Sequence, residues 1–214
     1  MKSNKKNRTY QSTYTDKFEQ LYDYDINEKK LSIRIESKNE YPNYFIRNIK
    51  KRNSIIPLTQ FDNPFKSIQN VHKEVIKYQR EDGLELSGIL YLPTNYEKGK
   101  KYPMIVNFYE KSSDGLFNHK VPSPGRSTIS YSFYTSRGYL IFNPDVNYRI
   151  GYPGESAYSC VIPGVTSLIE KGFVDKDNIG VQGHSWGGYQ IAYLVTKTDI
   201  FKAAESGAPV ANMI

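Results

Sequence analysis

The sequence predicts an α/β protein in which a mostly parallel sheet carries helices on both faces, preceded by a smaller antiparallel β segment. Two observations support this. From about residue 71 onward, apolar strand-like runs alternate with helix-like stretches, as in parallel sheets joined by crossover helices. Before that point, short runs of alternating apolar and polar residues follow one another across polar turns, which is typical of antiparallel strands. We therefore expect two parts, residues 1–70 and residues 71–214.

The first part contains four short strand-like runs. Leu31–Ile35 alternates apolar and polar residues with period two, and the other runs are Gln20–Tyr24, Tyr44–Arg47 and Ser54–Leu58. Polar residues separate them, the last group being Lys50–Asn53. Four short strands are typical of one blade of a β-propeller, in which about 4–8 blades close a ring. A small all-β cap is the alternative.

The second part begins with a hairpin and continues with buried strands and helices. Asp82-Gly83 is a strong hairpin signal between Val75–Tyr78 and Leu84–Leu92. Tyr102–Tyr109 is almost continuously apolar, which favours a strand buried on both faces. Further strands are expected at Tyr139–Phe142, Ile179–Gln182 and Phe201–Ser206, and helices at Ser127–Ser136, Ile162–Lys171 and Tyr189–Val195.

A G-x-S-x-G motif lies between the expected strand at Ile179–Gln182 and the helix after it. Ser185 is its central residue, with Gly183 before it and Gly187 and Gly188 after it. Strand, sharp turn and helix are the context of a nucleophile elbow, which raises the serine hydroxyl above the sheet in a strained backbone conformation. The flanking residues must be small so that the helix can leave close to the strand. The motif indicates a serine hydrolase.

Composition excludes several other classes. The chain has 214 residues, 14% of them aromatic, and a formal net charge of +7 that is concentrated in residues 1–80. The basic residues alternate with polar and acidic ones instead of clustering on a binding module, so we expect no nucleic-acid partner. No apolar run is long enough to span a membrane, and no export signal is evident. Neither metal nor organic cofactor is expected. Cys160, the one cysteine, is expected to be a buried, inert thiol.

An ordered series of motifs resembles the prolyl oligopeptidase family of serine peptidases, the S9 group. The resemblance covers roughly residues 31–214. Its motifs are Glu36–Asn43, Pro57–Pro64, Asp82–Gly88, Gly172–Val181 and Gly183–Gly188. It implies that residues 1–70 are the end of a β-propeller (its last blade). Residues 71–214 are then the N-terminal half of an α/β-hydrolase peptidase domain. The implied substrates are oligopeptides, and no prediction of oligomeric state or localisation follows.

The resemblance also implies roles for individual residues. Ser185 would attack the acyl carbon and form an acyl-enzyme. The backbone N–H of Trp186 would be one oxyanion donor, because it follows the nucleophile. The hydroxyl of Tyr109 is implied as the second donor, although Glu110-Lys111 stands where many relatives have small residues. His184 is expected to support packing, and His119, in the loop after Tyr109, is expected at the surface more than near the site.

The sequence also lacks part of the machinery that the motif requires. In α/β-hydrolases the triad acid and histidine follow the serine in the chain. No histidine follows Ser185, and Asp199 and Glu205 are too near the elbow helix to be the acid. We therefore expect a C-terminally truncated fragment that is inactive by itself. The alternatives are an esterase on the same fold, since the fold does not fix the substrate, or a truncated, non-catalytic binding module.

Overall fold

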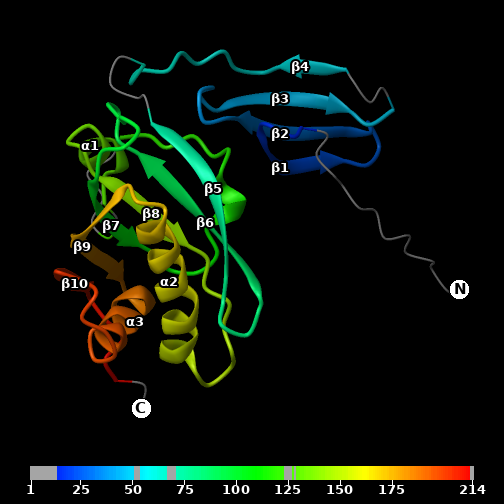
Figure 1. Ribbon diagram of the computed structural model, residues 1–214. Helices are drawn as coiled ribbons and strands as arrows, with labels where there is room; N and C mark the ends of the chain where they lie inside the picture. The colour runs from blue at the N-terminus through cyan, green and yellow to red at the C-terminus, as the bar shows by residue number, and fades with distance from the viewer. Residues whose placement is uncertain (1–13, 51–53, 67–70, 123–126, 128, 213–214) are drawn as a thin grey trace, which may run out of the picture. The chain divides into compact units, whose positions relative to one another are not determined.

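The computed structural model describes residues 14–50, 54–66, 71–122, 127 and 129–212 (Figure 1). The described residues form two compact units. One runs to Asn63 and includes Phe117–His119, and the other contains the rest of the chain from Pro64 onward. Within the described residues, no helix is long and apolar enough to cross a membrane. The two units are described separately.

The first unit is a four-stranded antiparallel sheet in the order β1-β2-β3-β4. Its strands are β1 Phe18–Asp25, β2 Lys30–Glu36, β3 Asn43–Asn48 and β4 Ile55–Pro57. All four strands expected in this part are confirmed, while the turn expected at 51–53 lies outside the described residues. The alternating side chains Leu31, Ile33 and Ile35 of β2 are buried on one face, as the period-two pattern predicts.

The second unit is a six-stranded mixed sheet in the order β10-β9-β7-β8-β6-β5. The four strands from β10 to β8 pair in parallel, whereas β8 with β6 and β6 with β5 pair antiparallel. The strands are β5 His72–Gln79, β6 Glu85–Leu92, β7 Tyr102–Asn107, β8 Leu140–Pro144, β9 Val174–His184 and β10 Ala203–Gly207. A short 3-10 helix, η1, spans Ser113–Gly115.

Helices cover both faces of this sheet, as the sequence predicts (Figure 1). Helices α2 (Pro153–Glu170) and α3 (Trp186–Leu194) lie on one face. There they contribute to a cluster of buried side chains that includes Leu90 and Phe142. The short helix α1 (Tyr131–Thr135) lies over the other face, where Ile89 and Ile141 point. Because successive residues of a strand point to opposite faces, β6 and β8 supply both cores.

Helix α2 begins earlier than the sequence indicates. A start at Ile162 is wrong, because the helix already begins at Pro153 and continues through Pro163. A proline in the first turn is favourable, since the N–H it lacks has no intrahelical partner there. Pro163 removes an interior hydrogen bond, and the packing of buried residues on both sides of it retains the helix. Cys160 lies inside the helix and is fully buried, as expected for an inert thiol.

We predict that Gly88→Ala destabilises the second unit, because a Cβ there would lie 2.6 Å from the Phe142 ring and 2.9 Å from the Asn143 carbonyl oxygen. Overpacking of this kind costs about 1–3 kcal/mol. Gly180→Ala is the matched control in another strand, since its Cβ would meet only the Ala203 carbonyl oxygen, at 3.7 Å. Urea unfolding followed by circular dichroism measures both. Equal midpoints for the two variants would contradict the prediction.

Candidate active site

Ser185 occupies the sharp turn between β9 and α3. Its backbone angles are φ 57° and ψ −113°, in a region that glycine tolerates and other residues rarely adopt. Such a conformation costs on the order of 1–3 kcal/mol and persists only where the surroundings enforce it. Here the Ser185 N–H donates to the Gly207 carbonyl oxygen (2.8 Å), and the Ser185 carbonyl accepts from the Tyr189 N–H (3.1 Å). The turn is therefore held from β10 and from within α3.

The three glycines of the motif lie where backbones approach closely. A Cβ on Gly187 would sit 2.8 Å from the Phe108 carbonyl oxygen, and one on Gly188 would sit 2.8 Å from the Gly207 carbonyl oxygen. A Cβ on Gly183 would lie 2.8 Å from Ile191 of α3. Side chains at these positions would force the backbone apart. These close contacts explain why glycine stands at each of the three positions.

Tyr109 follows the end of β7, beside the elbow. Its ring carbon Cδ2 is 3.8 Å from the Cβ position of Gly187, and its side chain is half exposed. The carboxyl ends of the parallel strands β7 and β9 meet at this edge of the sheet, so Tyr109, Ser185 and Trp186 all lie at one end of it. Trp186, the first residue of α3, stacks on Tyr189 with ring centroids 5.4 Å apart.

The loop after β7, which contains Glu110-Lys111, is fixed by a buried carboxylate. Asp145 follows β8 and accepts hydrogen bonds from the N–H groups of Ser112 (2.6 Å) and Ser113 (2.8 Å), and also from the Ser113 hydroxyl. Three donors satisfy the carboxylate in this buried position. The loop therefore has defined geometry despite its departure from small residues.

Tyr148, which sequence reasoning missed, bridges the two sides of the site. Its hydroxyl donates to the Tyr109 carbonyl oxygen (2.6 Å) and accepts from the side-chain amide of Gln190 in α3 (2.5 Å). Burial raises the pKa of Tyr148 to about 12, opposed by hydrogen bonds with Gln190 and with the Trp186 side chain. The sequence offered only one signal for a role of Tyr148, which was its position after the buried strand β8, the neighbour of β7.

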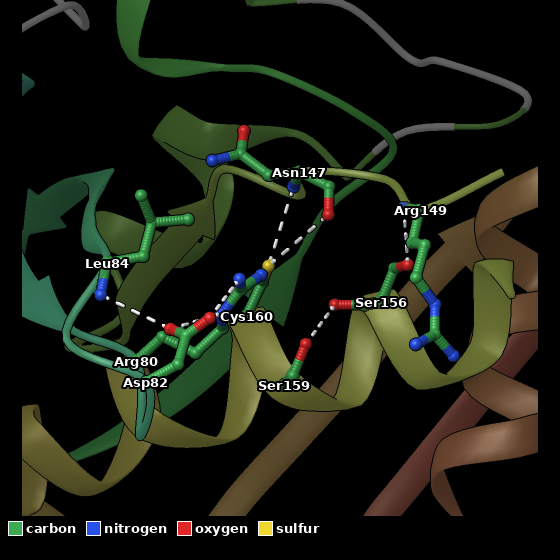
Figure 2. A network of polar contacts seen from close by, with 8 residues as sticks. All are labelled: Arg80, Asp82, Leu84, Asn147, Arg149, Ser156, Ser159 and Cys160. Atoms are coloured by element: carbon green, nitrogen blue, oxygen red, sulfur yellow. Dashed lines mark hydrogen bonds and ion pairs between the residues drawn. The ribbon is translucent and has the colours of Figure 1, made fainter.

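Helix α2 anchors the loop that carries Tyr148 (Figure 2). The N–H of Asn147 donates to the Cys160 sulfur (3.4 Å), and the N–H of Arg149 donates to the Ser156 hydroxyl oxygen (2.9 Å). The Ser156 hydroxyl in turn donates to the Tyr152 carbonyl oxygen (2.6 Å). The residues on either side of Tyr148 are thus tied to the same helix.

An exposed ion pair closes the β5–β6 hairpin nearby. Arg80 donates to both carboxylate oxygens of Asp82, at 2.9 and 2.6 Å, and the Leu84 N–H donates to the same carboxylate (Figure 2). These donors lower the pKa of Asp82 to about 2, with Arg80 the main cause. Because Asp82 is at the surface, the pair fixes the hairpin turn more than it stabilises the fold.

None of the three histidines hydrogen-bonds the Ser185 side chain within the described part of the chain. The expectation that His119 lies at the surface is wrong, because it is buried, with Nδ1 3.2 Å from the Ser37 carbonyl oxygen and its ring edge-to-face with Tyr41. Those partners are about 80 residues away in sequence, so no local pattern could reveal them. His72 is exposed, and the His184 ring lies beside Gly207.

Comparison with known proteins relates the segment that contains the elbow to a known family. Residues 150–214, which contain the elbow, match the model of the prolyl oligopeptidase family. This match covers less than a third of the chain, so it shows a likeness of the elbow segment to the prolyl oligopeptidase family, S9. This is a family of serine peptidases, and therefore of hydrolases. The chain spans about a fifth of the length of the curated relatives that it matches.

Individual relatives are distant in sequence. The chain is 28% identical over 176 residues to the Oryza sativa subsp. japonica protein named "Probable glutamyl endopeptidase, chloroplastic", covering 75% of this chain and 19% of that protein. It is 28% identical over 153 residues to dipeptidyl peptidase 8 of Homo sapiens, covering 64% of this chain and 16% of that protein. The structure of Porphyromonas gingivalis dipeptidyl peptidase 4 superposes with a TM-score of 0.71 at 18% identity, covering 91% of this chain and 29% of that one, which shows a shared fold.

The described residues contain no group of three or more His, Cys, Asp or Glu side chains that could hold a metal ion.

We predict that Ser185→Gly unfolds at higher urea than Ser185→Ala. Both variants lack the hydroxyl, but only glycine relieves the positive φ, which should raise the free energy of unfolding by about 1 kcal/mol. The measurement is the urea midpoint of each variant at one protein concentration. A lower midpoint for the glycine variant would show that the turn is not strained.

Proposed function

We propose that the chain supplies the nucleophile and the oxyanion donors of a serine peptidase that cleaves oligopeptides through an acyl-enzyme on Ser185. The observation that carries this proposal is the backbone of Ser185, held at φ 57° between β9 and α3 in a segment that resembles a family of serine peptidases. A strained serine at the carboxyl end of a central strand presents its hydroxyl above the sheet.

The fold supports the same assignment. Read from β5, the strand order β5-β6-β8-β7-β9-β10 with the elbow after β9 is consistent with the first six strands of an α/β-hydrolase. The four-stranded antiparallel sheet before it has the size and order of one propeller blade. We assign residues 71–214 to the hydrolase domain and residues 1–70 to the end of a propeller. A propeller beside a hydrolase would limit access to short peptides, and a simple esterase has no such sheet.

Two donors would stabilise the tetrahedral intermediate. The backbone N–H of Trp186 lies in the first turn of α3, where N–H groups have no intrahelical acceptor and the helix dipole favours negative charge. The second is the Tyr109 hydroxyl, presented at the adjacent strand end beside the elbow. Donors fixed in this way act on the charge that develops during attack, because they need no reorganisation.

A general base must still take the proton of Ser185. The described histidines do not supply it, and neither Asp199 nor Glu205 is a candidate for the acid that orients it. We therefore assign the base and the acid to polypeptide beyond residues 1–214. Residues 1–214 by themselves are expected to turn over peptides no faster than a triad-deficient serine peptidase, which retains only the catalysis due to its oxyanion donors.

The direct test compares residues 1–214 with the complete open reading frame that contains them. We expect the complete product to react with a fluorophosphonate probe and to hydrolyse a peptidyl amide, and Ser185→Ala to abolish both, because the serine oxygen forms the acyl bond. Ser136→Ala, an exposed serine at the end of α1, is the control and should react normally.

Labelling that survives Ser185→Ala would overturn the assignment. Hydrolysis of esters but not of peptide amides would favour an esterase on the same fold.

We further predict that Tyr109→Phe lowers kcat for the peptide amide by about 10²–10³-fold and changes KM little, since an oxyanion donor acts mainly in the transition state. Steady-state kinetics of the complete product measure both constants. A rise in KM at unchanged kcat would assign Tyr109 to ground-state binding of the substrate instead.

A further inference from the structure

The hydroxyl of Tyr148 connects three segments that meet at the candidate site. It lies on the loop after β8, donates to the Tyr109 carbonyl oxygen after β7, and accepts from Gln190 in the elbow helix α3. The side chain of Trp186, the residue after Ser185, also interacts with it. One oxygen atom thus contacts the segment that presents Tyr109 and the helix that begins at the nucleophile.

These contacts use the hydrogen-bonding capacity of the phenol. A tyrosine hydroxyl donates one hydrogen bond and accepts up to two. Here the single donor goes to a main-chain carbonyl, and Gln190, which is fully buried, occupies an acceptor position. A fully buried amide has few alternative partners, so its hydrogen bond to Tyr148 restricts where the phenol can lie.

Tyr148 is held at its own backbone as well. The N–H groups of Asn147 and Arg149, on either side of it, bond to Cys160 and Ser156 of α2 (Figure 2). Helix α2 is 18 residues long and packs against the sheet, so the loop has a rigid support. The phenol therefore bridges two fixed bodies, α2 and α3.

The backbone of Tyr109 is consequently restrained on both sides. The Phe108 carbonyl oxygen packs against Gly187, at the position where a Cβ would lie 2.8 Å away, and the Tyr109 carbonyl is held by Tyr148. Fixing the two peptide planes that flank a residue fixes its φ and ψ. Those angles set the direction of the Cα–Cβ bond, and with it the region that the Tyr109 hydroxyl can reach.

We propose that Tyr148 is a positioning residue that holds the main chain of Tyr109 and thereby aims the Tyr109 hydroxyl at the oxyanion formed on Ser185. This rests on the proposed function. In this role Tyr148 acts through Tyr109 and not through contact with the substrate. Because burial raises its pKa to about 12, Tyr148 stays protonated, and so remains a donor, throughout the pH range in which a peptidase operates.

The primary experiment is steady-state kinetics of Tyr148→Phe in the complete product. The substitution removes only the hydroxyl oxygen. We expect kcat to fall about tenfold or more with KM changed less than twofold, because a misplaced donor weakens the transition state selectively. A peptide aldehyde, which forms a tetrahedral adduct with the serine, should lose affinity by the same factor as kcat/KM. Tyr152→Phe is the matched control on the same loop and should behave as the wild type.

A double-mutant cycle shows whether Tyr148 acts through Tyr109. In the Tyr109→Phe background no hydroxyl remains to be aimed, so Tyr148→Phe should lower kcat less than twofold further. Full additivity of the two losses would overturn the proposal and assign Tyr148 an independent role. An unchanged kcat for Tyr148→Phe in an active enzyme would also overturn it.

A structural readout separates positioning from misfolding. Trp186 is the one tryptophan of the sequence, so the emission of residues 1–214 reports on the elbow. Tyr148→Phe should shift this emission while the urea midpoint stays close to that of Tyr152→Phe. A collapse of the midpoint would assign Tyr148 a purely structural role. Absence of any Ser185-dependent turnover in the wild-type complete product would instead overturn the proposed function, and this proposal with it.

Discussion

The close approach of backbones around Ser185 is the constraint on which the rest of the candidate site depends. Strand β9 can turn directly into α3 only because Gly183, Gly187 and Gly188 leave no side chain between the helix, the end of β7 and the end of β10. The hydrogen bond from Ser185 to the Gly207 carbonyl then holds the serine in its unfavourable conformation. The strained backbone of Ser185 lowers the stability of the fold, and the packing around it offsets this cost. Such strain is usual at functional sites.

Strand β8 contributes no proposed catalytic residue, yet the residues after it organise the site. Asp145 satisfies the N–H groups of the loop that follows β7, and Tyr148 holds the carbonyl of Tyr109. Both act on main-chain atoms, so they restrain the path of the neighbouring loop whatever side chains it carries. This explains how Glu110-Lys111 is accommodated without loss of order. The support for one strand end comes from the strand beside it, through polar contacts that hydrophobic patterning does not encode.

The sequence predicted the elements that depend on local patterns. The alternation in Leu31–Ile35, the apolar run from Tyr102 and the small residues around Ser185 each specify a local structure, and the structure has them. The predictions from sequence were wrong where packing between distant segments determines the structure. Helix α2 continues through Pro163 because buried residues on both sides of it pack against the sheet. His119 is buried through partners in a distant segment, and the role of Tyr148 depends on the pairing of β7 with β8.

The strand order has a consequence for how the chain folds. The inner strand β7 pairs with β9, although Asn107 and its partner Gln182 are 75 residues apart in sequence. Closing so long a loop costs entropy before the contact is gained, so this pairing is expected to form late. During synthesis β7 emerges well before β9, so one edge of β7 stays unpaired until β9 has been made. Ser185 follows β9 directly, so its hydroxyl reaches its final position only when the centre of the sheet closes. An incompletely folded chain would therefore not hold Ser185 in its strained turn.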